Sequence, residues 1–150
     1  MGTLSETLLA DDKRGKVIED SCRLIDGEVA AKSGITGLLI KGGYKAFKAV
    51  KPTMVHEAVT FLLPEFVGVM DRHYAEYLAA EPKKEMTLDR WLVRRDTKVA
   101  DDLLGITDRI MDRSNKAALK AIYKKLRPVG QRNVKEAIPG IGRLIASHVK

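Results

Sequence analysis

The sequence predicts an all-α fold, a single-domain irregular bundle of about six to eight helices over residues 1–150. Apolar residues recur at spacings of three and four along the whole chain. No stretch alternates apolar and polar residues in the way that a half-buried strand requires. Capping residues, prolines and glycines divide the helical pattern into segments joined by short loops.

Two helices are expected in the first third of the chain. The first begins at a cap on Asp11 or Asp12 and ends near Lys32. The second follows Ser33 as its N-cap and stops before Pro52. Glycines 42 and 43 lie on the side of this second helix that we expect to be buried, where they would allow close helix packing. The apolar residues expected on one side of this helix are Ile35, Leu38, Leu39, Phe47 and Val50.

The remaining helices are marked by caps and prolines. A third helix begins at Thr53 and is either kinked or split at Pro64. Residues 81–85 are expected to form a linker, after which Thr87 caps a short helix. The chain then re-enters a helix at Asp96 or Thr97. The last expected helices are one capped by Ser114 and ended by Pro128, and two segments, 129–137 and 142–150, joined by IPGIG at 138–142.

Composition places the protein in a reducing compartment. The only cysteine, Cys22, excludes an internal disulfide. No apolar run approaches the roughly 18–20 residues that span a bilayer, and no signal peptide is visible at the N-terminus. A chain of 150 residues can build a core without disulfides or metals. We therefore expect a cytoplasmic protein with no transmembrane segment.

The net charge of +7 is distributed unevenly along the chain. Residues 1–28 carry a net charge of −3 and residues 57–112 a net charge of −4. Residues 29–56 contain five lysines and no acid, and residues 113–150 contain ten basic residues and only Glu136 as an acid. The positive charge is thus concentrated in two blocks.

Within both blocks the cations follow helical spacing. In the first block, Lys41, Lys45 and Lys48 lie within about 60° of one another around the expected helix, opposite its apolar side. One interpretation is a solvated face, or a face paired with acids of a neighbouring helix. The other is a binding surface for a polyanion, and nucleic acid fits better than a membrane because no large apolar groups are expected beside the charges. The predicted stripes are Lys41, Lys45 and Lys48 in the first block, and Arg113, Lys116, Lys120, Lys124 and Arg127 in the second.

Residues 134–149, VKEAIPGIGRLIASHV, resemble the helix-hairpin-helix motif of DNA-binding proteins. In that motif two glycines, here Gly140 and Gly142, let the chain reverse tightly and bring backbone N–H groups to a phosphate. Arg143 would add a positive charge. The resemblance implies contact with the DNA backbone that does not depend on sequence. The alternative is that the glycines form an ordinary loop before a terminal helix.

The sequence contains no assembled catalytic or metal-binding motif. His56 and Glu57 begin like the HExxH motif of zinc proteases, but Thr60 stands where the second histidine is required. His73 and Glu76 are one helical turn apart but have no second pair at comparable spacing. We therefore expect no catalytic residue, no metal and no cofactor.

Three segments resemble a bacterial family of small helical proteins of unknown function. They are TLSETLLADDKR near the N-terminus, KPTMVHEAVTFLLPEF in the middle and YKKLRPVGQRNV in the last third. The resemblance implies a compact, cytosolic, all-helical protein and brings no activity, cofactor or site residue with it.

The function expected from the sequence is that of a non-catalytic binding or interaction module whose partner is not identified. The alternative is sequence-independent binding to duplex DNA phosphates through the basic region 113–150. A third alternative is an enzyme of unknown type, for which no constellation of residues is present.

Overall fold

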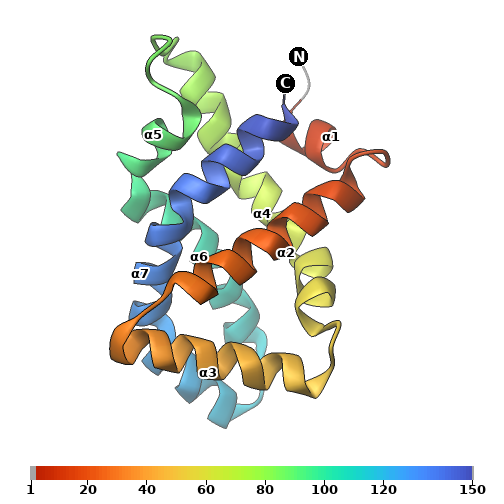
Figure 1. The fold of residues 1–150 in the computed structure, drawn as a ribbon, viewed down its shortest axis with the longest axis vertical. Helices are drawn as coiled ribbons and strands as arrows, with labels where there is room; N and C mark the ends of the chain where they lie inside the picture. The colour runs from red at the N-terminus through yellow and green to blue at the C-terminus, as the bar shows by residue number, and fades with distance from the viewer. Residues whose placement is uncertain (1–2, 150) are drawn as a thin grey trace.

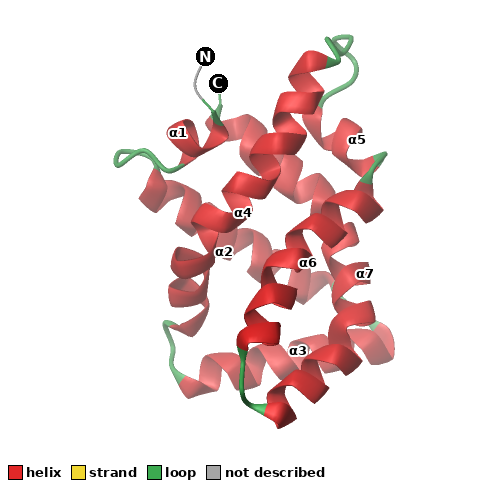
Figure 2. Cartoon of the chain, turned by 180° about the vertical axis from the view of Figure 1, so that it is seen from behind, coloured by secondary structure: helices red, strands yellow, loops and turns green. Residues whose placement is uncertain are grey.

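The computed structural model describes residues 3–149, with all of their side chains except those of Leu119 and Ile122. Within that range the protein contains seven α-helices and no strand, which confirms the predicted all-α bundle (Figures 1 and 2). The helices are α1 (Leu4–Leu8), α2 (Arg14–Ala31), α3 (Gly34–Val50), α4 (Met54–Ala79), α5 (Leu88–Val93), α6 (Asp96–Arg113) and α7 (Ala117–His148).

One hydrophobic cluster forms the core, and all helices except α3 contribute buried side chains to it. α7 packs mainly against α5 and α6, and α4 packs against α1, α2 and α6. α4 continues through Pro64 as one helix, so this proline does not split it. The buried members of the cluster are Leu4, Leu8, Val17, Ile18, Leu63, Val67, Val69, Met70, Leu88, Leu92, Val99, Leu103, Ile106, Ile138 and Ile145.

The short helix α1 was not predicted from the sequence. Its N-terminus carries a capping box in which the Thr3 hydroxyl and the Glu6 carboxylate accept from each other's backbone N–H groups, at 3.1 and 3.2 Å. Leu4 and Leu8 are buried, and the Leu4 backbone N–H donates to Asp71 Oδ1 in α4 at 2.9 Å. Packing on α4 therefore stabilises a helix that is too short to form alone.

Different elements lie at the two ends of the molecule. Figures 1 and 2 both show α3 lying across one end, which it shares with the turn between α6 and α7. The helix α1, the C-terminal end of α7 and the loop between α4 and α5 lie toward the opposite end. α3 belongs to the first basic block and the α6–α7 turn to the second. These two elements are far apart in the sequence but lie at the same end of the fold.

Candidate functional site

The second predicted stripe of cations is divided between two helices. α6 ends at Arg113, and α7 begins only after a turn at residues 114–116. The Lys116 backbone N–H donates to the Ser114 hydroxyl at 3.2 Å within this turn. The five cations therefore do not form one continuous helical stripe, and the predicted N-cap at Ser114 is wrong because Lys116 is the N-cap of α7. The stripe residues that do share α7 are Lys120, Lys124 and Arg127.

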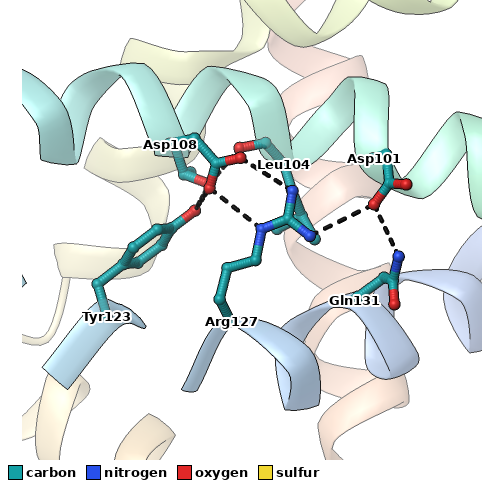
Figure 3. A network of polar contacts seen from close by, with 7 residues as sticks. Asp101, Leu104, Asp108, Tyr123, Arg127 and Gln131 are labelled. Carbon is teal, nitrogen blue, oxygen red and sulfur yellow. Dashed lines mark hydrogen bonds and ion pairs between the residues drawn. The ribbon is translucent and has the colours of Figure 1, made fainter. Parts of the chain in front are cut away.

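Arg127 is paired with carboxylates of α6 (Figure 3). Its Nη2 donates to Asp108 Oδ2 at 2.9 Å and its Nε to Oδ1 of the same carboxylate at 3.2 Å. Its Nη1 lies 3.3 Å from Asp101 Oδ1, which also accepts from the Gln131 side chain at 2.7 Å. Pairing with acids of a neighbouring helix, one of the two interpretations of the stripe, is confirmed for this residue.

Tyr123 extends the same network. Its hydroxyl donates to Asp108 Oδ1 at 2.5 Å and lies 2.7 Å from the Thr107 hydroxyl. The hydrogen bond from Arg127, followed by that from Tyr123, holds the pKa of Asp108 below its usual value of 3.8. Burial, followed by the neighbouring carboxylate, raises the pKa of Tyr123. The network joins α7 to α6 and so serves the fold.

Replacing Arg127 by methionine is expected to lower the free energy of unfolding by about 1–2 kcal/mol at neutral pH. The cost is smaller than for a fully buried pair because the Asp108 side chain is 36% exposed. The lowered pKa of Asp108 adds stability above its usual value of 3.8, and this stability is lost as the pH falls through the lowered pKa. In denaturant unfolding, the difference in free energy of unfolding between wild type and variant should therefore narrow as the pH falls from about 3.8 through the lowered pKa of Asp108. A difference that is the same at neutral and acidic pH would contradict this prediction.

Lys120 and Lys124 remain exposed. Across residues 3–149, no carboxylate lies within ion-pair distance of either ammonium group. They line a shallow cleft that also contains Asp108 and Asp112, so positive charge in the cleft is partly balanced. Nucleic-acid binding by these cations stays a prediction.

The IPGIG segment forms no turn. α7 runs without a break from Ala117 to His148, with Pro128 and Pro139 inside it. Each proline removes one backbone hydrogen bond and favours a bend, and Figure 1 shows α7 following a bent path. Both interpretations of this segment, the hairpin and the ordinary loop, are therefore wrong. The predicted end of a helix at Pro128 is wrong as well.

Gly140 and Gly142 are buried where α7 packs closely on two neighbouring helices. A Cβ atom at Gly142 would lie 2.6 Å from the Cα of Asp89 in α5, and one at Gly140 would lie 2.5 Å from the side chain of Leu24 in α2. The backbone at both positions is thus covered by protein and closed to a phosphate. Arg143 is exposed and lies 4.0 Å from the carboxylate of Asp89.

α3 presents its apolar side to solvent. Ile35 is 82% exposed, Leu38 74% and Val50 73%. Gly42 and Gly43 are exposed too, with no atom within 4 Å of a Cβ built on either. The expectation that this side of the helix is buried is therefore wrong. We call the five residues Ile35, Leu38, Leu39, Phe47 and Val50 the α3 apolar face.

The opposite, polar side of α3 attaches the helix to α2. Gly37 is buried, and a Cβ atom there would lie 2.7 Å from the carbonyl carbon of Lys32. The Tyr44 hydroxyl donates to Asp26 of α2, and burial followed by this hydrogen bond raises the pKa of Tyr44. The Lys48 ammonium lies 4.0 Å from the same carboxylate and 5.1 Å from the centre of the Tyr44 ring.

The α3 apolar face therefore points away from α2. Successive helical residues turn by about 100°, so Ile35 lies opposite Tyr44 on the helix. Lys41 and Lys45 are exposed, and Lys45 lies within about 20° of Leu38, at the border of the face. Within the described part of the chain, no carboxylate is within ion-pair distance of Lys41 or Lys45. An apolar surface bordered by unneutralised cations is the most unusual feature of the molecule.

The sequence pattern did not mark the α3 apolar face as a candidate site. Periodicity locates the apolar side of a helix, but the same pattern fits a helix on a core and a helix on an external surface. The available signal was the coincidence of this apolar side with residues 29–56, which carry lysines and no acid.

His73 and Glu76 do not converge on a common site. The buried His73 ring places Nε2 2.8 Å from Asp102 Oδ2 of α6. Glu76 pairs instead with Arg95, whose hydrogen bond lowers the pKa of that carboxyl. Among residues 3–149, no three His, Cys, Asp or Glu side chains are grouped so that they could hold a metal ion.

Comparison with known proteins identifies a family but no characterised relative. The sequence model of a protein family described as "Family of unknown function (DUF6918)" matches residues 4–149. No curated protein and no solved structure matches the chain. None of the described helices is by itself long and apolar enough to cross a membrane, although α3 and α4 meet that test together, bent by 99° at their joint.

Proposed function

The chain belongs to this family of unknown function, and we propose that it is a non-catalytic binding module that docks on anionic lipid surfaces through α3. The observation that carries the proposal is the α3 apolar face, which is exposed on a helix whose charged residues are all lysines. The proposal includes no reaction, because the polar pairs described above join helices to one another.

The composition of α3 fits the interface of a bilayer. A helix that lies at this interface buries its apolar face among headgroups and upper acyl chains, and it uses lysines on its polar side to attract anionic lipids. Lysines at the border of the face can keep their ammonium groups in water while their aliphatic stems cover apolar surface. Each cation close to an anionic surface contributes about 1 kcal/mol.

The position of α3 supports the same docking mode. The helix lies across one end of the molecule (Figure 1). Its apolar face lies opposite the side that bonds to α2. The helix can therefore lie in the plane of a membrane while the remaining helices stay in water. The core does not change in this arrangement, because no α3 side chain among the described residues belongs to it.

Two other occupants fit this surface less well. A second copy of the chain would bring two lysine-only helices together, and like charges at such an interface repel. Nucleic acid would pair with the lysines but would leave the apolar face in water, because its outer surface is a row of phosphates. An anionic lipid surface is both charged and apolar, so it matches the face and its border together.

A tryptophan reporter in the face tests the proposal. The exposed Leu39 is replaced by tryptophan, and native Trp91 gives a constant background because it packs on Tyr77 and Arg95 in another part of the fold. Vesicles of phosphatidylcholine mixed with phosphatidylglycerol should shift the reporter emission to shorter wavelength, and added salt should weaken the effect. Pure phosphatidylcholine should have little effect. The proposal fails if anionic vesicles leave the emission unchanged. If the protein binds duplex DNA but not the vesicles, the nucleic-acid alternative is favoured.

A further inference from the structure

We infer that the corner between α6 and α7 is a second contact with the same anionic lipid surface, an inference that rests on the proposed function of α3. The α6–α7 corner comprises the exposed cations Arg113, Lys116, Lys120, Lys124 and Lys125. It would give the molecule a second point of attachment at the end that α3 crosses.

The location of the corner is the first argument. Figures 1 and 2 view the molecule from opposite sides, and both place the turn at residues 114–116 at the end of the molecule that α3 crosses. A flat surface that meets α3 at this end therefore also comes close to the corner. The loop between α4 and α5, which carries Lys83 and Lys84, lies at the other end.

The charge of the corner is the second argument. Residues 113–135 contain no acidic residue. Asp108 and Asp101, the acids of α6 that face this part of α7, already pair with Arg127. Asp112 lies beside Lys120 and Lys124 in the cleft and offsets one charge. Within residues 3–149, no carboxylate lies within ion-pair distance of any of the five cations of the corner.

The two contacts would depend on different interactions, the hydrophobic effect at α3 and electrostatic attraction at the corner. The α3 apolar face gains free energy by leaving water, whereas the corner attracts anionic headgroups across a gap of up to one Debye length, about 8–10 Å at ordinary ionic strength. The corner should therefore add affinity that disappears in high salt, and it should not change how deeply α3 enters the interface.

The test removes two corner charges in the full-length chain. Lys116→Gln with Lys120→Gln is compared with a matched control, Lys83→Gln with Lys84→Gln, which removes the same charge from exposed residues at the other end. Binding to vesicles of phosphatidylcholine and phosphatidylglycerol is measured by sedimentation, with the Leu39→Trp reporter for insertion. The corner variant should bind about 25-fold more weakly, or about fivefold for each charge. The control should bind like the wild type, and the emission of bound reporter should be the same in both.

The outcomes separate this inference from the function of α3. If the wild type binds anionic vesicles and the corner variant binds equally well, the second contact is refuted and α3 docking stands. If corner variant and control weaken binding alike, only net charge matters, and the second contact is again refuted. If the wild type does not bind these vesicles at all, the proposed function itself is refuted.

Discussion

Replacement of Gly142 by alanine is expected to lower the free energy of unfolding by about 2–3 kcal/mol. The added Cβ would lie 2.6 Å from the Cα of Asp89 and 3.0 Å from its backbone nitrogen. These are backbone atoms of α5, which cannot move aside as the end of a flexible side chain can. α5 and α7 must therefore separate, and the packing of buried Leu88 and Ile138 loosens with them. Denaturant unfolding monitored by circular dichroism measures the change.

The same substitution at Gly130 provides the control. Gly130 lies in α7 as well, but no atom is within 4 Å of a Cβ built there. Because alanine is the better helix former, Gly130→Ala should raise the free energy of unfolding by up to about 1 kcal/mol. Opposite signs at the two glycines are thus expected. Equal effects would show that the close contact between α7 and α5 is absent and would reopen the hairpin interpretation.

The double substitution Ile35→Gln with Leu38→Gln is expected to weaken binding to anionic vesicles by about thirtyfold or more. It removes two aliphatic side chains from the α3 apolar face and leaves the net charge and the helical propensity of α3 nearly unchanged. Each aliphatic side chain contributes about 1.5–3 kcal/mol when it is fully buried, so partial insertion of two accounts for at least about 2 kcal/mol. Vesicle sedimentation measures the loss.

Stability measurements on this variant test the exposure of α3 independently. Ile35 and Leu38 touch no part of the core, so the free energy of unfolding should change by no more than about 0.5 kcal/mol. If both side chains were buried, their loss would cost about 2–5 kcal/mol each. The matched control is Leu78→Gln with Val93→Gln, which changes two exposed apolar residues outside α3. It should leave vesicle binding intact.

Local signals predicted most of the helix boundaries. The expected helix from Asp11 or Asp12 to Lys32 corresponds to α2 (Arg14–Ala31), and Ser33 is the N-cap of α3. The predicted linker at 81–85 lies in the loop before α5, and Thr87 is the N-cap of that helix. Helical periodicity and residue preferences at helix ends act over a few residues, so the sequence alone contains them. The caps themselves were predicted less well, because the N-cap of α2 is Lys13 and neither Ser33 nor Thr87 forms a side-chain capping hydrogen bond.

Where the prediction was wrong, tertiary packing had overridden a local preference. Pro128 and Pro139 suggest helix ends, yet α7 passes through both. The buried Ile138 and Ile145 on either side of the second proline hold the helix on the core, and the glycines between them allow α2 and α5 to approach. Sequence spacing contains no information on such neighbours.

The α3 apolar face was missed for a related reason. The amphipathic pattern of α3 was recognised, but an apolar side reads the same whether it faces a core or an external partner. The contacts on the other side of α3 decide which way the apolar side faces. There, buried Gly37 and the hydrogen bond from Tyr44 to Asp26 attach α3 to α2. Those contacts turn the apolar face outward.

One lipid titration tests the central claim most directly. It measures the partition between buffer and anionic vesicles of three proteins: the wild type, the Ile35→Gln and Leu38→Gln variant, and the Leu78→Gln and Val93→Gln control. We predict that the wild type and the control bind with the same affinity and that the α3 variant binds at least about thirtyfold more weakly while remaining folded. Equal binding by all three proteins, or no binding by the wild type, would contradict the claim that α3 docks on lipid through its apolar face.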